Sequence, residues 1–335
     1  MKITKPDYYD KFRCLAGSCP DSCCKEWDIQ VDAAAAERYR SLPGALGDDL
    51  RRVLTDCDGE TVMEIISGRC PMWRKDGLCR IQAELGEHAL CRTCREFPRL
   101  TNDYGDFQEW GLELSCPEAA RLILSCPEPG YSVVEVPGGI PGEYDREAME
   151  VLLRTRAQAE ALLLDRSHPF AQTLALVLLY GYQAQAELDG EDAQEFDADC
   201  ALQDGEKLAE SASLSEFLCF FAGLEILTDA WRELLASPAP AGWSESHRCL
   251  ALYLIRRYYL QAVSDYDLIS RIKFILISCL AVQLLGGDPI RTAQLYSKEI
   301  ENDIDNLDAI LDAAYDCPAF TDRKILGMLL QPVKP

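Results

Sequence analysis

The sequence has few of the features that mark nucleic-acid-binding or membrane proteins. Its 33 lysines and arginines are interspersed among 56 acidic residues, which gives a formal net charge of −23. Binding to a phosphate backbone requires clustered basic side chains, so we expect no nucleic acid as a partner. No apolar stretch reaches the roughly 18 residues that a membrane span needs, and the best candidate is residues 170–182. We therefore expect that segment to be a buried helix and no membrane as a partner.

We also expect no secretory signal. The first residues, MKITKPDYYDKF, have no apolar run behind their charges. We expect a cytoplasmic protein, in which the thiol pool keeps cysteines reduced. At 335 residues the chain can build a sizeable core without disulfide staples. Its 16 cysteines therefore indicate metal or redox chemistry before structural disulfides.

Common cofactor and catalytic motifs are missing as well. No G-x-G-x-x-G follows an expected strand and no P-loop occurs, so neither type of nucleotide site is predicted. Cys19 and Cys23 have the first spacing of the C-x3-C-x2-C signature of radical S-adenosylmethionine enzymes, but Glu26 stands at its third position. No Ser/His/Asp or Cys/His arrangement is suggested by spacing, and a hydrolase is not expected.

The cysteines are concentrated in the first part of the chain. Eleven of them fall in residues 1–126, where Cys57 and Cys126 are isolated from the rest. The five later cysteines are scattered, and we interpret them as buried small residues. The predicted metal ligands are the nine clustered cysteines: Cys14, Cys19, Cys23, Cys24, Cys70, Cys79, Cys91, Cys94 and Cys116.

Their spacing favours a thiolate metal site. Two cysteines separated by two residues, such as Cys91 and Cys94, can bind one ion because a tight turn brings both sulfurs to one side. The adjacent Cys23 and Cys24 cannot easily do so; they serve two centres, or one ligates while the other packs. Nine thiols supply four ligands twice with one left over, or one cluster plus a redox or structural group.

Ligand softness leaves both zinc and an iron–sulfur cluster open. The chain has only three histidines, and such mostly thiolate ligation favours the iron–sulfur cluster. One of the three, His88, lies among the cysteines; we expect it to be exposed or to support a ligand rather than to bind metal itself.

Composition divides the chain into two parts. We predict a cysteine-rich metal-binding domain at 1–126, a Pro- and Gly-rich linker at 127–145 with one short strand at YSVVEV, and a helical domain at 146–335. The fold class is mainly α, with a loop-rich, cysteine-clustered N-terminal half followed by an all-α bundle. Residues 1–126 carry 17 basic and 22 acidic residues, and the remaining 209 carry 16 and 34. This acidic half is either a solvated surface or one that attracts a lysine-bearing partner.

Hydrophobic periodicity gives the expected elements. In the N-terminal half it predicts helices at 31–42 (capped by Asp32), 50–57 and 81–94, and a strand at 61–66, with the rest held together by cysteines rather than by apolar burial. In the C-terminal half the predicted helices lie at 146–165, 168–187, 204–210, 213–236, 245–263, 266–285, 289–298 and 302–315.

Three segments carry a resemblance to a known family. They are YYDKFRCLAGSCPDSCCKEWDIQVD (8–32), CPMWRKDGLCRIQAELGEHALCRTCREFPR (70–99) and LELSCPEAAR (112–121). Their order and spacing resemble the flagellin lysine-N-methylase family over about residues 3–121. The middle segment is also similar to small zinc- or iron-chelating cysteine-cluster proteins.

The resemblance implies an enzyme that transfers methyl groups from S-adenosylmethionine to lysine ε-amines of flagellin or another lysine-bearing protein. It also implies that the nine cysteines bind an iron–sulfur cluster, of the [4Fe–4S] type. The other residues within the matching motifs are Trp27, Phe97, Pro98, Arg99, Glu118 and Arg121.

Aromatic and acidic side chains near the cysteines could stabilise a sulfonium donor, although we expect core or surface roles for most of them. These are Trp27, Trp73, Trp110, Asp28, Glu109 and Glu113. Two other functions stay open. One is a non-catalytic zinc or iron–sulfur module whose helical half binds a partner. The other is a redox sensor that uses Cys23 and Cys24, or Cys91 and Cys94, as its thiol pair.

Overall fold

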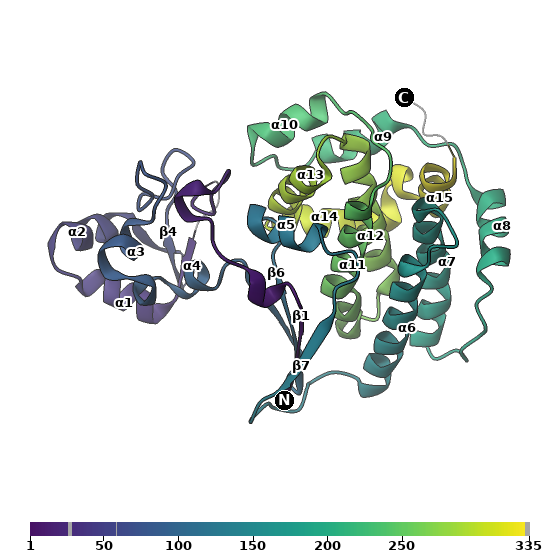
Figure 1. Cartoon of the computed structure of the whole chain (residues 1–335), viewed down its shortest axis with the longest axis horizontal. Coiled ribbons are helices and arrows are strands. Elements are labelled where there is room, and N and C mark those ends of the chain that lie inside the picture. The colour runs from purple at the N-terminus through teal and green to yellow at the C-terminus, as the bar shows by residue number, and fades with distance from the viewer. Residues whose placement is uncertain (26–28, 58, 332–335) are drawn as a thin grey trace. The chain divides into compact units, whose positions relative to one another are not determined.

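The computed structural model describes residues 1–25, 29–57 and 59–331. It is 58% helical and 12% strand, so the prediction of a mainly α protein is confirmed. The chain forms two compact units (Figure 1), which we call the helical unit and the cysteine-rich unit. The helical unit contains Met1–Lys11, Thr101–Ser115 and Ala120–Pro335, and the cysteine-rich unit contains Phe12–Leu100 and Cys116–Ala119.

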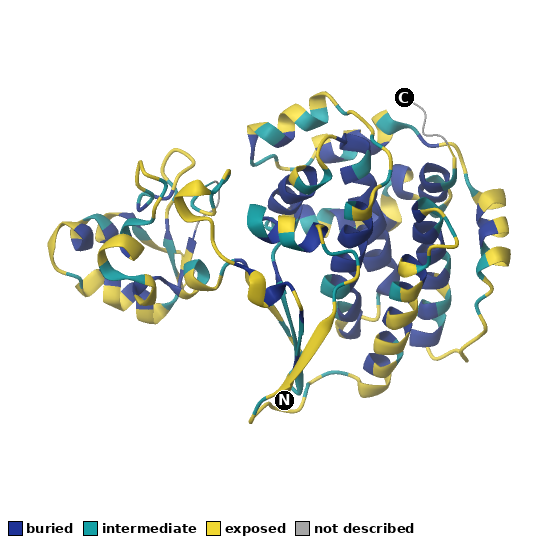
Figure 2. Cartoon of the chain, viewed as in Figure 1, coloured by how far each residue is buried: buried dark blue, intermediate teal, exposed yellow. Residues whose placement is uncertain are grey.

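The helical unit is built around one deeply buried helix, α12 (Leu268–Leu285), which packs against α7, α11 and α14. Figure 2 shows that its central helices are almost wholly buried. Its other helices are α6 (Arg146–Leu164), α7 (Phe170–Leu188), α8 (Ala198–Leu208), α9 (Leu214–Ala222), α10 (Asp229–Ala236), α11 (Glu245–Tyr258), α13 (Pro289–Tyr296), α14 (Ile304–Asp316) and α15 (Asp322–Leu330). Short turns complete it: η1 (Tyr9–Lys11), η4 (Tyr259–Ser264), the π-helical η5 (Ser297–Glu301) and η6 (Pro318–Phe320).

Helix α12 corrects the expectation about apolar stretches. By length and composition it could cross a membrane, and residues 170–182 are not the longest candidate. However, 94% of α12 is buried inside the protein, as in the core helix of a globular domain. Its two charges have partners, because Arg271 pairs with Asp265 at 2.6 Å and Lys273 donates to the carbonyl of Ala314.

A four-stranded sheet brings distant segments into the helical unit. It contains β1 (Lys2–Pro6), β5 (Arg99–Asp103), β6 (Phe107–Leu112) and β7 (Tyr131–Glu135), in the order β5-β6-β1-β7. β1 is parallel to β6 and antiparallel to β7. The boundaries of the two units differ from the predicted ranges 1–126, 127–145 and 146–335. Residues 1–11 and 101–115 belong to the helical unit, because β1 and β6 hydrogen-bond within its sheet. The strand expected at YSVVEV is β7, which confirms that prediction.

The cysteine-rich unit has its own three-stranded sheet, in the order β2-β4-β3. Its elements are η2 (Ala16–Ser18), β2 (Ile29–Val31), α1 (Ala33–Ser41), α2 (Gly44–Val53), β3 (Leu54–Cys57), β4 (Glu60–Met63), α3 (Arg80–Leu85), η3 (Glu87–Ala89) and α4 (Arg92–Glu96). Helix α5 (Pro117–Leu124) belongs in part to each unit. The helix predicted at 50–57 is wrong in its second half, where the chain turns into β3.

Apolar burial also stabilises this unit, contrary to the expectation that cysteines alone hold it together. Side chains including Ile29, Tyr39, Leu50 and Met63 form one buried core. Cys70 and Cys91 are members of that core, and Cys24, Cys79 and Cys94 pack against it. The cysteines therefore line the edge of an ordinary hydrophobic core.

Candidate metal centre

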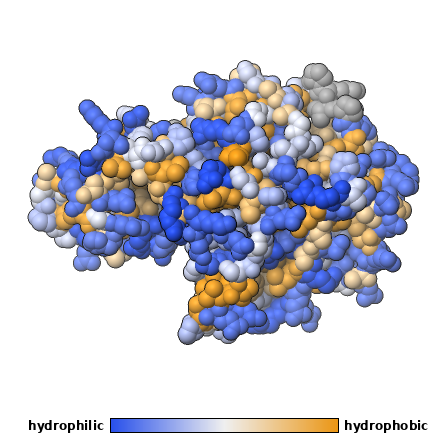
Figure 3. Space-filling model, viewed as in Figure 1, coloured by the Kyte–Doolittle hydropathy of each residue, from blue (hydrophilic) through white to orange (hydrophobic). Residues whose placement is uncertain are grey.

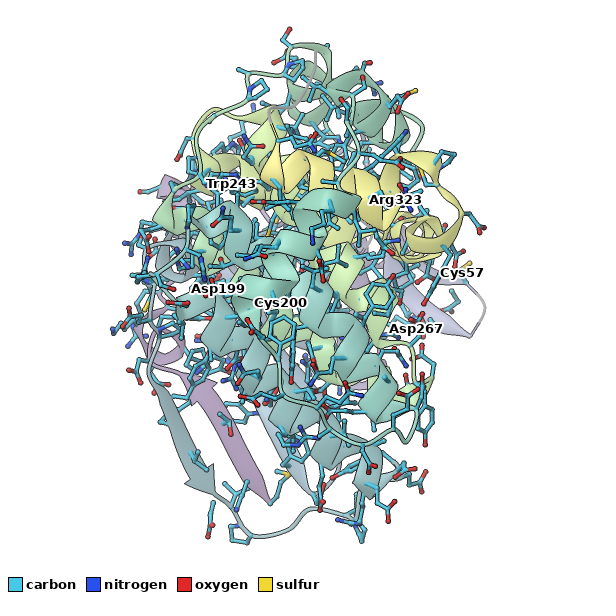
Figure 4. All side chains as sticks on the ribbon, turned by 90° about the vertical axis from the view of Figure 1, so that its right-hand side faces the viewer. Cys57, Asp199, Cys200, Trp243, Asp267 and Arg323 are labelled. Carbon is cyan, nitrogen blue, oxygen red and sulfur yellow. The ribbon has the colours of Figure 1, made fainter. Side chains whose placement is uncertain are left out.

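All nine cysteines of the predicted set belong to the cysteine-rich unit. This includes Cys116, which the strands β5 and β6 separate from the other eight along the chain. Cys57 belongs to the same unit but is exposed on β3 (Figure 4). Cys200 on α8 and Cys219 on α9 of the helical unit are also exposed, so the expectation that the later cysteines are buried is wrong for these two.

The turn that carries Cys91 and Cys94 is fixed by two contacts with β2 and α1. Cys91 is the N-cap of α4, and Cys94 lies on its first turn. The carboxylate of Asp32 accepts the backbone N–H of Arg92 at 2.7 Å. The Thr93 hydroxyl donates to a backbone carbonyl of β2 at 2.8 Å. Both contacts stabilise the start of a helix of only five residues, which could not persist without tertiary packing.

The other cysteine segments are linked by backbone hydrogen bonds. The N–H of Cys70 donates to the carbonyl of Cys24 at 2.8 Å, which joins segments 46 residues apart. Cys79 is the N-cap of α3 and forms a β-bridge with Trp73. Near Cys14, the backbone of Gly17 passes so close to Gly77 that a Cβ added at Gly77 would lie 3.1 Å from the Gly17 Cα. Gly77 also has a φ of +80°, so this crossing requires glycine.

The thiol side chains bond to one another in two sets. Interactions with the thiols of Cys23 and Cys70 lower the pKa of Cys24 to about 3. The Cys70 thiol also donates to the sulfur of Met63 at 3.6 Å. Cys94 donates to Cys91 and lowers the pKa of Cys91 to about 7. The same interactions raise the pKa of the partner thiols Cys23, Cys70 and Cys94. Cys24 and Cys91 are therefore the two positions where the unit favours a thiolate, the form that binds metal.

Electrostatic interactions connect these two sets. The negative charge of Cys24 raises the pKa of both Cys79 and Cys94, and that of Cys91 raises the pKa of Cys79. We call these six residues the inner group: Cys23, Cys24, Cys70, Cys79, Cys91 and Cys94.

The remaining three cysteines form an outer group of Cys14, Cys19 and Cys116. The pKa of Cys116 is raised to about 11, mainly by burial and also by the negative charges of Cys19 and Cys14. The negative charges of Cys14 and Cys116 also raise the pKa of Cys23. Cys23 therefore joins the outer group to the inner group, while its neighbour Cys24 bonds within the inner group.

The donor set fits a soft metal in its chemistry. Every member is a thiol, two positions favour the thiolate, and an apolar core lies beside them. Zinc and iron–sulfur centres both take such ligands. Within the described residues, however, no three His, Cys, Asp or Glu side chains have already converged as ligands of one ion. Metal binding at the inner group therefore requires the sulfurs to be drawn closer together.

The other predicted site residues have structural partners. Trp73 lies under the guanidinium of Arg69 at 4.8 Å, and Trp110 of the helical unit contacts Tyr9 at 5.6 Å between ring centroids. His88 is exposed, as expected.

The acidic candidates of β6 are also engaged. Glu109 forms a two-pronged ion pair with buried Arg156, at 2.6 and 2.7 Å. Burial raises the pKa of Glu113, whose neighbours include Arg257 and Glu301. Trp27 and Asp28 lie outside the described residues.

One feature of the helical unit was not predicted. A groove of about 1100 Å³ is lined by the β5–β6 turn, by residues 139–145 and by side chains preceding and beginning α12. Tyr104 and Tyr144 line it, with ring centroids 6.5 Å apart and ring planes perpendicular. Met1 also lines it, and the Met1 ammonium group donates to the carbonyls of Val136 and Gly138. The Pro- and Gly-rich segment predicted as a linker thus forms one wall of this groove.

The two units define a cysteine-cluster protein with a large helical unit, and similarity to known proteins identifies its family. The chain is 33% identical over 135 residues to the flagellar biosynthetic protein FliU of Salmonella muenchen, covering 38% of this chain and 80% of that protein. It is 32% identical over 135 residues to the lysine-N-methylases of Salmonella typhimurium and Salmonella choleraesuis. The chain therefore belongs to the flagellin lysine-N-methylase family, which confirms the resemblance described above.

The extent of these similarities differs between the relatives. The matched part spans about a third of each lysine-N-methylase, 34% of its length. No family model and no solved structure matches the chain.

Proposed function

We propose that the chain is a protein lysine N-methyltransferase of the flagellin-methylating type, acting in the cytoplasm. We further propose that its cysteine-rich unit holds an iron–sulfur cluster and that S-adenosylmethionine is the methyl donor. The observation that carries the proposal is the gathering of all nine family-motif cysteines into one unit. The similarity to proteins named lysine-N-methylases supports the reaction type.

The proposed reaction breaks the bond between the donor's methyl carbon and its sulfonium sulfur. A C–N bond forms to the lysine ε-nitrogen, the sulfur leaves as a neutral thioether, and a proton leaves the amine. The amine must be neutral to attack, whereas free lysine has a pKa near 10.4. Desolvation or a nearby base must therefore remove its proton. When bound, a cluster with one iron open would supply a position for the donor.

The residues of this chain would contribute a prepared set of thiolates. The lowered pKa values of Cys24 and Cys91 favour their thiolate forms, so metal binding at these positions would release fewer protons. Cys23 would link the inner group to Cys14, Cys19 and Cys116. The apolar core beside Cys70 and Cys91 would keep water from one side of the centre.

A thiol redox sensor is the second candidate. The hydrogen-bonded pairs Cys23 with Cys24 and Cys91 with Cys94 favour it, because their sulfurs are already neighbours. Oxidation of either pair would form one S–S bond and release two protons and two electrons to a cellular oxidant. A non-catalytic zinc module is a third reading of the same thiols.

A methylation assay separates these functions. Anaerobically purified protein is incubated with flagellin and S-adenosylmethionine labelled in its methyl group, and label on lysine is measured by mass spectrometry. We expect transfer by the wild type and by Cys200→Ser, whose thiol is exposed and outside the set, and at least a hundredfold loss in Cys24→Ser, in line with the loss of a metal site. Metal-loaded protein that transfers no label would contradict the enzyme proposal and leave the sensor or the module.

A further inference from the structure

Strand β7 forms an exposed edge of the sheet in the helical unit. It is the last strand in the order β5-β6-β1-β7, so within the described part of the chain it pairs on one side only, with β1. All five of its residues are exposed. An unpaired edge presents a row of backbone N–H and C=O groups that can pair with another chain.

The register shows which backbone groups face outward. Hydrogen bonds join Asp7 to Gly130 and Val136 to Met1, at 2.9 and 3.0 Å. In an antiparallel pair, hydrogen-bonded and non-bonded positions alternate, so Ser132 and Val134 of β7 also bond to β1.

The alternate residues of β7 point the other way. Tyr131, Val133 and Glu135 direct their N–H and C=O groups to the open side, and among the described residues these groups have no backbone partner. Within the part of the chain that the structure describes, three donors and three acceptors are therefore available to an added strand.

Several exposed side chains at this edge are apolar, although Ser132 and Glu135 of β7 are polar. Val133 is 59% exposed and Val134 44%, and Ile140, shortly after the strand, is 73% exposed. Figure 3 shows an apolar patch at this end of the sheet. Proteins usually protect such edges with lysine, proline or a bulge, but the sequence YSVVE contains neither lysine nor proline.

Charge indicates the kind of segment that fits. The helical unit contains 20 basic and 40 acidic residues, whereas the cysteine-rich unit contains 13 and 16. A second copy of this chain would meet the like charge of the helical unit. A basic segment would be attracted to it.

The groove wall that follows β7 carries the same bias. Carboxylates of Asp103, Glu143 and Asp145 line the groove. These three carboxylates outnumber the cationic groups of the groove, one of which, Arg271, is paired with Asp265. Asp103 and Asp145 accept hydrogen bonds from neighbouring groups and keep their negative charge toward the groove's lining residues. A lysine side chain entering this groove would find acidic partners and tyrosine rings.

We propose that the edge of β7 binds an extended, lysine-bearing segment of the substrate protein as an added strand. Backbone hydrogen bonds to Tyr131, Val133 and Glu135 hold the segment, and the acidic groove beyond the strand selects lysine. That this segment is the methylation substrate rests on the proposed function; the binding itself does not.

The test uses the variant Val133→Pro, which removes one outward N–H and leaves the bonds to β1 intact. Val133→Thr is the matched control, because it keeps both the N–H and the β-branched shape. The probe is a fluorescein-labelled 15-residue flagellin peptide containing lysine, and its affinity is measured by anisotropy without methyl donor. We expect Val133→Pro to weaken binding by about fivefold to tenfold and Val133→Thr to change it less than about twofold.

A second probe does not depend on the folding of any variant. The same peptide carrying backbone N-methyl groups on alternate residues should lose its affinity for the wild-type protein, because it cannot complete the added strand. Equal affinity of the N-methylated and plain peptides, or of Val133→Pro and wild type, would overturn the proposal. So would a wild-type dimer that Val133→Pro converts to a monomer in light scattering, because the edge would then belong to a second copy.

These outcomes separate this proposal from the proposed enzyme. Edge-dependent binding without methyl transfer would support the docking surface and contradict the activity. Transfer to flagellin that is unaffected by Val133→Pro would support the activity and contradict the docking surface.

Discussion

The carboxylate of Asp32 accepts the backbone N–H of Arg92 across 60 residues of sequence, at 2.7 Å. Its other oxygen accepts the N–H of Ala35 at 3.0 Å and caps α1. One side chain therefore fixes the start of α1 and the start of the helix that carries Cys94. This relationship couples the packing of the cysteine-rich unit to the position of its thiols.

Asp32→Ala should destabilise this unit by about 1–2 kcal/mol, the cost of losing a helix cap, and Asp32→Asn should cost less because it keeps an acceptor oxygen. The backbone N–H of Arg92 lowers the pKa of Asp32. The stabilisation is therefore present above the unfolded pKa of about 3.9 and is lost as the pH falls through the lower folded value. Urea unfolding at pH 7 and pH 3 measures both effects. Equal unfolding free energies for Asp32→Ala and wild type at pH 7 would exclude the capping role.

Loss of the ion pair between Glu109 and Arg156 should strongly destabilise the helical unit. Their side chains are only 13% and 5% exposed, so Glu109→Gln leaves a buried guanidinium without the carboxylate that is bonded to it. We expect a loss of about 3 kcal/mol. Lys207→Met is the control, because its pair with Asp204 is 72% and 60% exposed and should contribute less than about 1 kcal/mol. Denaturant titrations that give both variants the same small loss would contradict this difference.

His247 should make the helical unit sensitive to mild acid. It is buried in the capping box of α11, beside Ser244, and burial lowers the pKa of His247 to about 4. Protonation therefore favours the unfolded chain, so stability is complete above about pH 6.5 and declines as the pH falls toward 4.

The loss should approach about 3 kcal/mol over that interval. His247→Asn should flatten the dependence of the unfolding midpoint on pH between 6.5 and 4. The exposed His88 gives the control variant, His88→Gln, which should retain the wild-type slope. A wild-type midpoint that does not change over this interval would show that His247 remains uncharged without cost.

Local sequence patterns predicted most helices of the C-terminal half well. The range 146–165 corresponds to α6 (Arg146–Leu164), because its apolar residues recur at helical spacing and Asp145 caps it. The range 213–236 proved to be two helices, separated after the C-cap Gly223. The helix predicted at 81–94 ends early for a similar reason: Gly86 has a φ of +90°, which stops α3.

Long-range pairing could not be predicted in this way. The parallel register of β1 with β6 joins residues more than 100 positions apart, and hydropathy within a strand does not identify its partner. The cysteine set itself followed from spacing and family motifs. The backbone hydrogen bond from Cys70 to Cys24 could not be predicted from the sequence, because it depends on the tertiary contact between their two loops. The same holds for the effect of the Cys70 thiol on the pKa of Cys24.

Metal and sulfide analysis of the anaerobically purified full chain tests the central claim most directly. The account predicts a brown protein with roughly four irons and matching sulfide per chain. Cys94→Ser should lose most of this iron, while Cys200→Ser, an exposed cysteine outside the set, should retain it. Colourless wild-type protein, with stoichiometric zinc or with no metal, would contradict the iron–sulfur centre. Full iron in Cys94→Ser would contradict the role of the inner group as its ligands.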